Sequence, residues 1–285
     1  MESAVRIVAR DQRDRVGEGP LWVARESALY WVDILGQRLN RLMLDDNSIS
    51  SWAMPEPIGW IIERAGKPGF IAGFQSGFAF LELDPVRIRR IASPEPHRPS
   101  NRLNDAKADD DGAIWAGTMP MDGDGAEGAF YRLDPSGVID CVDTGYRIPN
   151  GPAISLDGRW LYHADSALST VYRYAIADGK LTGREVFLRF DADWGLPDGM
   201  TVDAEGGLWI AHWGGGCVSR FAPDGVRDRR IALPASQITS CTFGGVGLDR
   251  MFVTSAALGK EDALEGALFE VDPGCRGIPA RKFAG

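Results

Sequence analysis

The sequence contains few of the residues on which zinc-finger, redox and disulfide-stabilised proteins depend. Its 285 residues include only four cysteines, with no CxxC pair, and three histidines. These numbers and spacings exclude a zinc finger and a thioredoxin-like redox site. A disulfide framework is not expected either, so Cys217 and Cys241 are predicted to be small buried apolar residues that keep reduced thiols.

Long apolar runs and basic runs are missing as well. No apolar stretch reaches the roughly 18 residues of a membrane span, and the N-terminal segment MESAVRIVARDQRDR lacks the apolar core of a signal peptide. The formal net charge of −9, without a basic cluster, argues against nucleic acid and anionic membranes as partners. We therefore expect a cytoplasmic protein. The absence of a GxSxG motif argues against a serine esterase.

Glycine and tryptophan are abundant, with 35 and nine copies, which is typical of short strands packed by aromatic rings and joined by tight turns. A large apolar residue recurs in a central strand at intervals of roughly 41 to 47 residues. These residues are Tyr30, Ile71, Trp115, Tyr162, Trp209 and Phe252. The repeat predicts an all-β fold, a six-bladed β-propeller with a central channel, as one domain over residues 1–285. We expect the recurring rings to form the core between blades.

The ring of blades must also close. The segment AVRIVAR at 4–10 alternates like a strand, so it is expected to complete the blade built from the last repeat.

Polar residues recur at one phase of the innermost strands, which line the channel of a propeller. The predicted first residues of these strands are Glu18, Ile58, Asn104, Asn150, Asp198 and, approximately, Ser240. Equivalent positions form a ring at one mouth of the channel, and four of these six carry Glu, Asn or Asp. The glycines that follow three of them, Gly19, Gly151 and Gly199, allow a tight turn.

Two hypotheses explain this polar ring. Carboxylates that converge on one axis repel each other, and a divalent cation would relieve the repulsion. Oxygen ligands suit Ca²⁺, Mg²⁺ or Mn²⁺ better than Zn²⁺. The alternative is a set of Asx turns that begin the strands, because Asn-Gly and Asp-Gly are common turn pairs. Spacing alone leaves both open.

Four segments carry a family resemblance: GEGPLW, RLNDAKADDDGAIWAGTM, PNGPAISLDG and PDGMTVDAEGGLWIA. In this order, over nearly the whole chain, they resemble the family that joins senescence marker protein, gluconolactonase and luciferin-regenerating enzyme. Within it the chain looks most like bacterial sugar-lactone lactonases. The resemblance implies a six-bladed propeller with one divalent metal ion, which hydrolyses aldonolactones such as glucono-, xylono- or arabinolactone to the aldonic acid.

The resemblance also implies roles for individual residues. Glu18, Asn150 and Asp198 match the metal ligands, with Ca²⁺ favoured by the oxygen donors and Zn²⁺, Mn²⁺, Mg²⁺ or Fe²⁺ also compatible. Asp198 is suited to take a proton from the attacking water and return it to the ring oxygen. Arg102 and Asn104 match residues that contact substrate.

Two of these implied assignments have alternatives. Asp122 stands where the family often has a Glu that touches substrate, and this shorter acid within GTMPMDGDG departs from the pattern and leaves the sugar specificity open. Arg102 could instead be a surface residue paired with Asp105 or Asp109.

Other candidates are weaker. His163 and His212 are predicted to be hydrogen-bonded strand histidines rather than ligands. Trp60 and Trp213 are expected near the channel mouth, where they would either stack on a sugar or pack in the core or the rim. The competing functions are a non-catalytic propeller that binds a partner and a related propeller esterase or phosphotriesterase, which a wide apolar mouth would favour. Oligomeric state is not indicated by the sequence.

Overall fold

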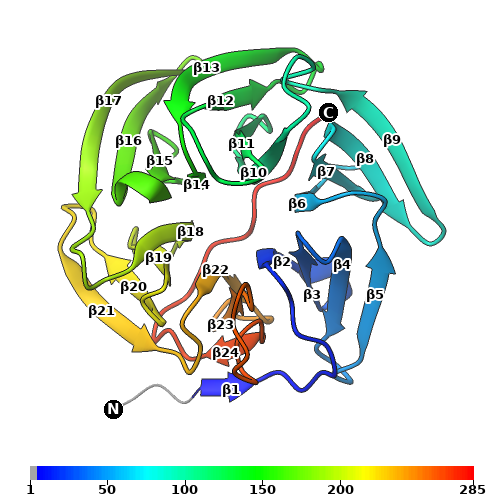
Figure 1. Cartoon of the computed structure of the whole chain (residues 1–285), viewed down its shortest axis with the longest axis vertical. Coiled ribbons are helices and arrows are strands. Elements are labelled where there is room, and N and C mark those ends of the chain that lie inside the picture. The colour runs from blue at the N-terminus through cyan, green and yellow to red at the C-terminus, as the bar shows by residue number, and fades with distance from the viewer. Residues whose placement is uncertain (1–4) are drawn as a thin grey trace.

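The computed structural model describes residues 5–285, which form six four-stranded antiparallel sheets around a central axis (Figure 1). The predicted six-bladed propeller is confirmed. The inner strands are β2 (Gly17–Val23), β6 (Ile58–Glu63), β10 (Asn101–Ala108), β14 (Pro149–Ile154), β18 (Leu196–Val202) and β22 (Ile238–Gly244). The second strands are β3 (Ala28–Asp33), β7 (Phe70–Phe74), β11 (Ile114–Pro120), β15 (Trp160–Asp165), β19 (Leu208–Trp213) and β23 (Arg250–Ser255).

The outer half of each blade is built from shorter or more exposed strands. The third strands are β4 (Arg38–Met43), β8 (Gly77–Leu83), β12 (Gly128–Leu133), β16 (Thr170–Ala177), β20 (Cys217–Phe221) and β24 (Phe269–Val271). The outermost strands are β5 (Ile49–Ala53), β9 (Val86–Ala92), β13 (Ile139–Tyr146), β17 (Lys180–Arg189), β21 (Arg227–Ala232) and β1 (Val5–Ile7). Within residues 5–285 the helices are two 3₁₀ turns, η1 (Ala24–Glu26) and η2 (Ser166–Leu168), and neither could span a bilayer.

The N-terminal strand closes the ring. β1 pairs antiparallel with β24, so that Val5 lies opposite Val271 and Ile7 opposite Phe269. The expectation that the N-terminal segment completes the last blade is confirmed, although the strand covers only part of the predicted 4–10, and position 4 lies outside the described residues. The first and last parts of the chain therefore share one sheet, and the ring is held shut by backbone hydrogen bonds.

The large residues of the second strands form the core, as predicted. Trp115 and Trp209 are fully buried. Their indole N–H groups donate to buried carboxylates at the ends of the preceding inner strands, Trp115 to Asp109 at 2.8 Å and Trp209 to Asp203 at 2.9 Å. The same carboxylates accept turn N–H groups, including that of Ala113. Each ring therefore fills space between blades without leaving its polar atom unsatisfied.

Each inner strand shifts its pairing register against the second strand near its start. The shifts lie between Glu18 and Leu21, Ile58 and Trp60, Leu103 and Ala106, Asn150 and Ala153, Pro197 and Met200, and Ile238 and Ser240. An extra residue in one strand bends it and re-aims its side chains. The predicted ring positions lie in or beside these bulges, within the first four residues of each inner strand rather than always at the first.

The glycines beside the polar positions act in two different ways. Gly19 and Gly151 have φ of 52° and 64°, a conformation that glycine adopts readily in the expected tight turn. Gly199 does not have a positive φ, so the prediction is wrong for it. There a side chain is excluded by close packing, since a Cβ would overlap the Ser240 side chain.

The C-terminal segment crosses the centre of the ring (Figure 1, red). Its backbone bonds to groups near the ends of inner strands from different blades, where Gly277 N–H donates to Leu248 at 2.7 Å and Phe283 N–H donates to Glu63 at 2.9 Å. The Phe283 side chain is buried beside Phe80. Because the polar positions lie at the starts of the inner strands, this segment covers the opposite end of the channel.

Replacement of Phe283 by Ala should therefore destabilise the whole propeller. Removing a buried ring leaves a cavity, which costs about 3–5 kcal/mol of unfolding free energy. Urea unfolding of Phe283→Ala measures this loss. Val246→Ala is the control, because Val246 is fully exposed. Equal unfolding free energies for Phe283→Ala and the original protein would contradict the packing of the C-terminal segment.

Candidate active site

All six predicted site residues line one pocket of about 240 Å³ at the starts of the inner strands. They are Glu18, Arg102, Asn104, Asp122, Asn150 and Asp198. The remaining two positions of the predicted ring lie elsewhere, since Ile58 is buried in the apolar core and Ser240 lines a deeper cavity. Four blades thus each place one polar side chain on the pocket floor: Glu18 from β2, Asn104 from β10, Asn150 from β14 and Asp198 from β18.

Two carboxyl groups dominate the electrostatics of the floor. Glu18 and Asp198 are each 5% exposed. Burial raises the pKa of Glu18 well above its ordinary value, and the charges of Asp198 and Asp105 raise it further. Burial likewise raises the pKa of Asp198, and the charge of Asp105 adds to the effect. Both acids therefore favour a proton or a cation beside them.

The oxygen atoms of these acids differ in their partners. Glu18 Oε2 accepts the N–H of Gly19 at 2.7 Å. Asp198 Oδ1 has no hydrogen-bond partner among the residues that the structure describes, although it is buried. A buried charged oxygen without a partner is costly, so this atom is available to a ligand in the pocket.

A hydrogen-bond chain fixes the two asparagines of the floor. Asn104 Nδ2 donates to Asn150 Oδ1 at 2.9 Å and to the Pro149 carbonyl at 2.7 Å. Asn150 Nδ2 donates to Ser166 Oγ at 3.0 Å, and this hydroxyl donates to the Pro197 carbonyl at 2.6 Å. The orientation of the Asn150 amide is thus set from both ends, and its Oδ1 keeps a second lone pair for a ligand.

Ser166 was missed by the sequence reasoning. It lies in η2 directly after β15, where a serine is typical of any turn. Nothing in its spacing distinguishes a residue that holds Asn150 from one that only begins the turn.

Arg102 lies at the edge of the floor. Its Nη1 donates to Asn104 Oδ1 at 2.6 Å, and its Nη2 lies 3.3 Å from Met119 Sδ. Burial lowers the pKa of Arg102 to about 10, while the negative charges of Glu18 and Asp198 act in the opposite direction. The guanidinium therefore stays protonated at neutral pH and supplies a positive charge beside the two acids.

The alternative in which Arg102 is a surface partner of Asp105 or Asp109 is wrong. Asp109 accepts the indole N–H of Trp115 instead. Asp105 lines the channel, and among the described residues Arg102 donates to Asn104 instead. Asp105 is a further acid of the channel that sequence reasoning treated only as this surface partner.

Asp122 and the tryptophans occupy different levels. Asp122 is exposed in the loop after β11, where its Oδ1 accepts the N–H of Asp124 at 3.1 Å. Trp213 is half-buried and lines the pocket, as expected. Trp60 is buried in the core and lines the deeper cavity, which confirms the core-packing alternative and not a place at the mouth.

Neither predicted strand histidine reaches the pocket. His212 Nδ1–H donates to the Trp194 carbonyl at 2.8 Å, which confirms the expected hydrogen bond. His163 differs: its ring stacks on Phe130 at 4.1 Å, and neither nitrogen has a partner among the described residues. Burial lowers the pKa of His163 to about 3 and that of His212 to about 4, so both rings are neutral.

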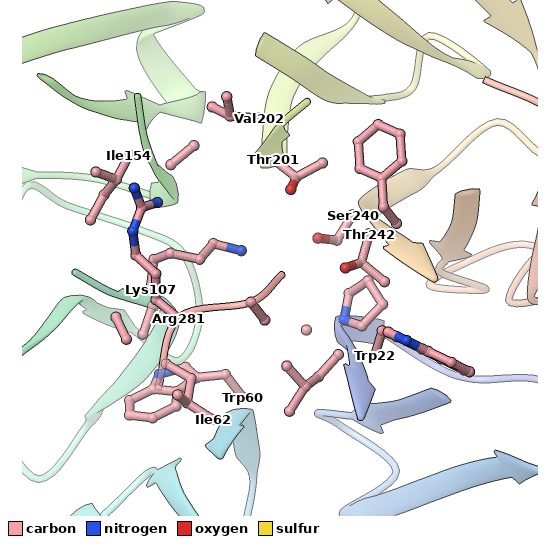
Figure 2. Close-up of a pocket in the computed structure, with 18 of the residues that line it drawn as sticks. Trp22, Trp60, Ile62, Lys107, Ile154, Thr201, Val202, Ser240, Thr242 and Arg281 are labelled. Atoms are coloured by element: carbon pink, nitrogen blue, oxygen red, sulfur yellow. The ribbon is translucent and has the colours of Figure 1, made fainter. Parts of the chain in front are cut away.

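A second cavity, of about 80 Å³, lies deeper in the channel. In Figure 2 the amino group of Lys107 extends into it, facing the hydroxyl groups of Ser240 and Thr242. The C-terminal segment forms part of the wall through Arg281. Burial raises the pKa of Asp105, which also lines this cavity, and the charge of Lys107 opposes that shift. The positively charged Lys107 thus lies deeper in the channel than the acids of the pocket floor.

The floor fits a hard cation better than a soft one. Residues 5–285 hold no group of three or more His, Cys, Asp or Glu side chains arranged to bind a metal. The floor instead combines two carboxylates with the amide oxygen of Asn150, all of them oxygen donors. Such donors suit Ca²⁺, Mg²⁺ or Mn²⁺. The unpartnered Asp198 Oδ1 is the observation that supports a bound ion.

Comparison with known proteins gives consistent matches over nearly the whole chain. Residues 16–257 match the family model described as the SMP-30/Gluconolactonase/LRE-like region. Pentonolactonase XacC from Haloferax volcanii is 36% identical over 94% of both chains. L-arabinolactonase from Azospirillum brasilense is 35% identical over 96% of this chain and 94% of its own. A regucalcin from Agrobacterium tumefaciens strain C58, described as a calcium-binding protein, superposes with a TM-score of 0.91 at 27% identity, covering 99% of this chain and 98% of its own.

Proposed function

Because the chain belongs to the SMP-30/gluconolactonase/LRE-like family, we propose that it is a divalent-metal-dependent hydrolase that opens sugar lactones to the aldonic acid. The pair of buried carboxylates with an unpartnered oxygen on the pocket floor is the observation that carries this proposal. Relatives named as a pentonolactonase and an arabinolactonase support an aldonolactone such as glucono-, xylono- or arabinolactone as the substrate.

Glu18, Asn150 and Asp198 are the proposed metal ligands. The two carboxylates would nearly neutralise the ion, and the Asn150 oxygen would be the third donor. Ca²⁺ is favoured because all three donors are oxygen atoms, and the calcium-binding description of the Agrobacterium regucalcin agrees with this choice. When bound, the ion supplies Lewis acidity, which polarises the lactone carbonyl.

The chain's own residues then account for proton transfer and binding. Water adds to the carbonyl carbon and loses a proton to the Asp198 carboxylate. The ring carbon–oxygen bond breaks, and the same proton returns to the ring oxygen, which becomes the hydroxyl of the open acid. Arg102 donates to a substrate hydroxyl or to developing negative charge, and Asn104 holds its guanidinium in place. Asp122 faces the outer hydroxyl groups from the rim.

The other hypotheses account for fewer of these features. A phosphotriester or bulky lactone would need a wide mouth, whereas this pocket of about 240 Å³ is smaller than those that hold drug-sized ligands. A partner-binding propeller gives no reason for two buried acids on one pocket floor. We place the reaction in the cytoplasm, because all four cysteines are free thiols and a reducing compartment keeps them so.

Replacing Asp198 by Ala should weaken metal binding. The variant loses one of two charged donors, and even outer partners of metal ligands contribute about tenfold to hundredfold in affinity. Calorimetric titration with Ca²⁺ and Mn²⁺ measures the change. Asp124→Ala, which removes an exposed acid from the nearby loop, is the matched control. Unchanged affinity in Asp198→Ala would remove this residue from the metal site.

Chelation should abolish lactone hydrolysis and leave the propeller folded. The six packed sheets do not depend on an ion at the channel mouth for their hydrogen bonds. The test combines proton release from a lactone with circular dichroism before and after EDTA, and then after Ca²⁺ is restored. EDTA already saturated with Ca²⁺ serves as the control. Activity retained in protein verified as metal-free would contradict the Lewis-acid mechanism.

Replacing Arg102 by Ala should lower kcat/KM and leave metal content unchanged. A donor that meets developing charge contributes about 2–4 kcal/mol to the transition state, equivalent to roughly 30- to 1,000-fold in rate. Asn104→Ala should act in the same direction, because Asn104 orients the guanidinium. Arg87→Ala, on an exposed outer strand, is the control. A near-normal kcat/KM in Arg102→Ala would mean that other loops hold the substrate.

A further inference from the structure

The pocket has one polar side and one apolar side. The polar side belongs to the third blade, where Arg102 and Asn104 come from β10 and Asp122 follows β11. The side formed by the first, fifth and sixth blades consists of Val16, Ile34, Leu35, Leu196, Trp213 and Leu258. Apart from the indole N–H of Trp213, these side chains have no hydrogen-bonding group. The wall above the polar floor is therefore amphipathic.

The apolar side is held by backbone and side-chain contacts. Leu196 lies opposite Trp213 in the β18–β19 ladder, and Trp213 in turn bridges to Gln237 of the next blade. Gln237 Nε2 donates to the carbonyl of Leu258 at 3.1 Å. Three apolar residues from two blades are thereby joined into one surface. Leu258 is 44% exposed although its side chain is entirely apolar, and it lies at the pocket mouth.

This arrangement restricts how a lactone can lie in the pocket. Its carbonyl belongs at the floor, and above the floor its hydroxyl-bearing edge pairs with Arg102, Asn104 and Asp122 of the third blade. The end of the molecule farthest from the carbonyl then faces the apolar side. A hydroxyl placed against Leu196 and Leu258 would find no protein partner among the described residues except the indole N–H of Trp213, whereas a methyl group would gain from burial.

We propose that the preferred substrate is a 6-deoxyaldonolactone, a sugar lactone that ends in a methyl group in place of the hydroxymethyl group. The methyl group lies against Leu196, Trp213 and Leu258. This inference rests on the proposed lactonase function and adds the substrate class. Met119, Met121 and Ile148, which flank the polar side, leave few further partners for hydroxyl groups.

Three lactones of matched configuration test the proposal: a galactonolactone, its 6-deoxy counterpart, and the pentonolactone that lacks this carbon. We expect kcat/KM to be highest for the 6-deoxy compound, by roughly tenfold to hundredfold over the galactonolactone, the range that one such group usually supplies. A galactonolactone hydrolysed as well as the 6-deoxy compound would overturn this inference and leave the lactonase proposal standing. Hydrolysis of none of the three, with Ca²⁺, Mn²⁺ or Zn²⁺, would overturn both.

Variants of the apolar side locate the preference. Leu196→Asn and Leu258→Asn introduce a hydrogen-bonding amide of similar size, so each should reduce the ratio of the two kcat/KM values by at least about threefold. Leu258→Met keeps an apolar side chain and should retain the ratio. Val246→Asn makes the same type of change at a fully exposed turn after β22 and is the control. If both folded Asn variants keep the original ratio, the assigned position of the methyl group is overturned.

Discussion

Repulsion between buried acids is the constraint on which the site depends. Glu18, Asp105 and Asp198 converge in the channel, and burial together with their neighbours' charges raises the pKa of Glu18 and Asp198 well above the ordinary values. Such crowding is unfavourable unless positive charge or protons are supplied. Arg102 on one side and Lys107 on the other meet part of this demand, and a divalent ion at the floor would meet the rest.

The propeller creates this crowding through a feature repeated in every blade. Each inner strand bulges near its start, so residues far apart in the chain present their side chains to one axis. Pairing of β1 with β24 closes the ring and keeps the inner strands in place. The C-terminal segment covers the other end of the channel, which leaves the pocket open on one face. The propeller therefore brings the acidic side chains together and leaves the pocket open at one end of the channel.

Floor and wall of the pocket have separate roles in this view. The floor draws one polar group from each of four inner strands, and its asparagines are oriented by the hydrogen-bond chain that includes Ser166. Most of the wall comes from residues that flank the strands, such as Leu35 and Leu258, where side chains can change without altering the inner ring. The floor thus suits one type of reaction, while the wall determines which lactone fits.

The sequence by itself determined the number of blades, the strand that closes the ring and the positions of Glu18, Asn104, Asn150 and Asp198 at one level. These features follow from the regular spacing of apolar and polar residues along the chain, which can be seen without knowing how the blades pack. Only the tertiary structure decided that Asp105 and Lys107 face the channel, that Ser166 orients Asn150, and that the pocket has an apolar side.

The expectations that failed have the same physical origin. Trp60 lies below the floor and not at its mouth, the His163 ring is held by aromatic packing, and Gly199 is required by the closeness of Ser240 rather than by its φ. Each of these features depends on the distance between neighbouring blades, which the spacing of residues within one strand does not predict. Contacts between blades arise only when all six sheets pack around one axis, so these features belong to the folded ring and not to any segment of the chain.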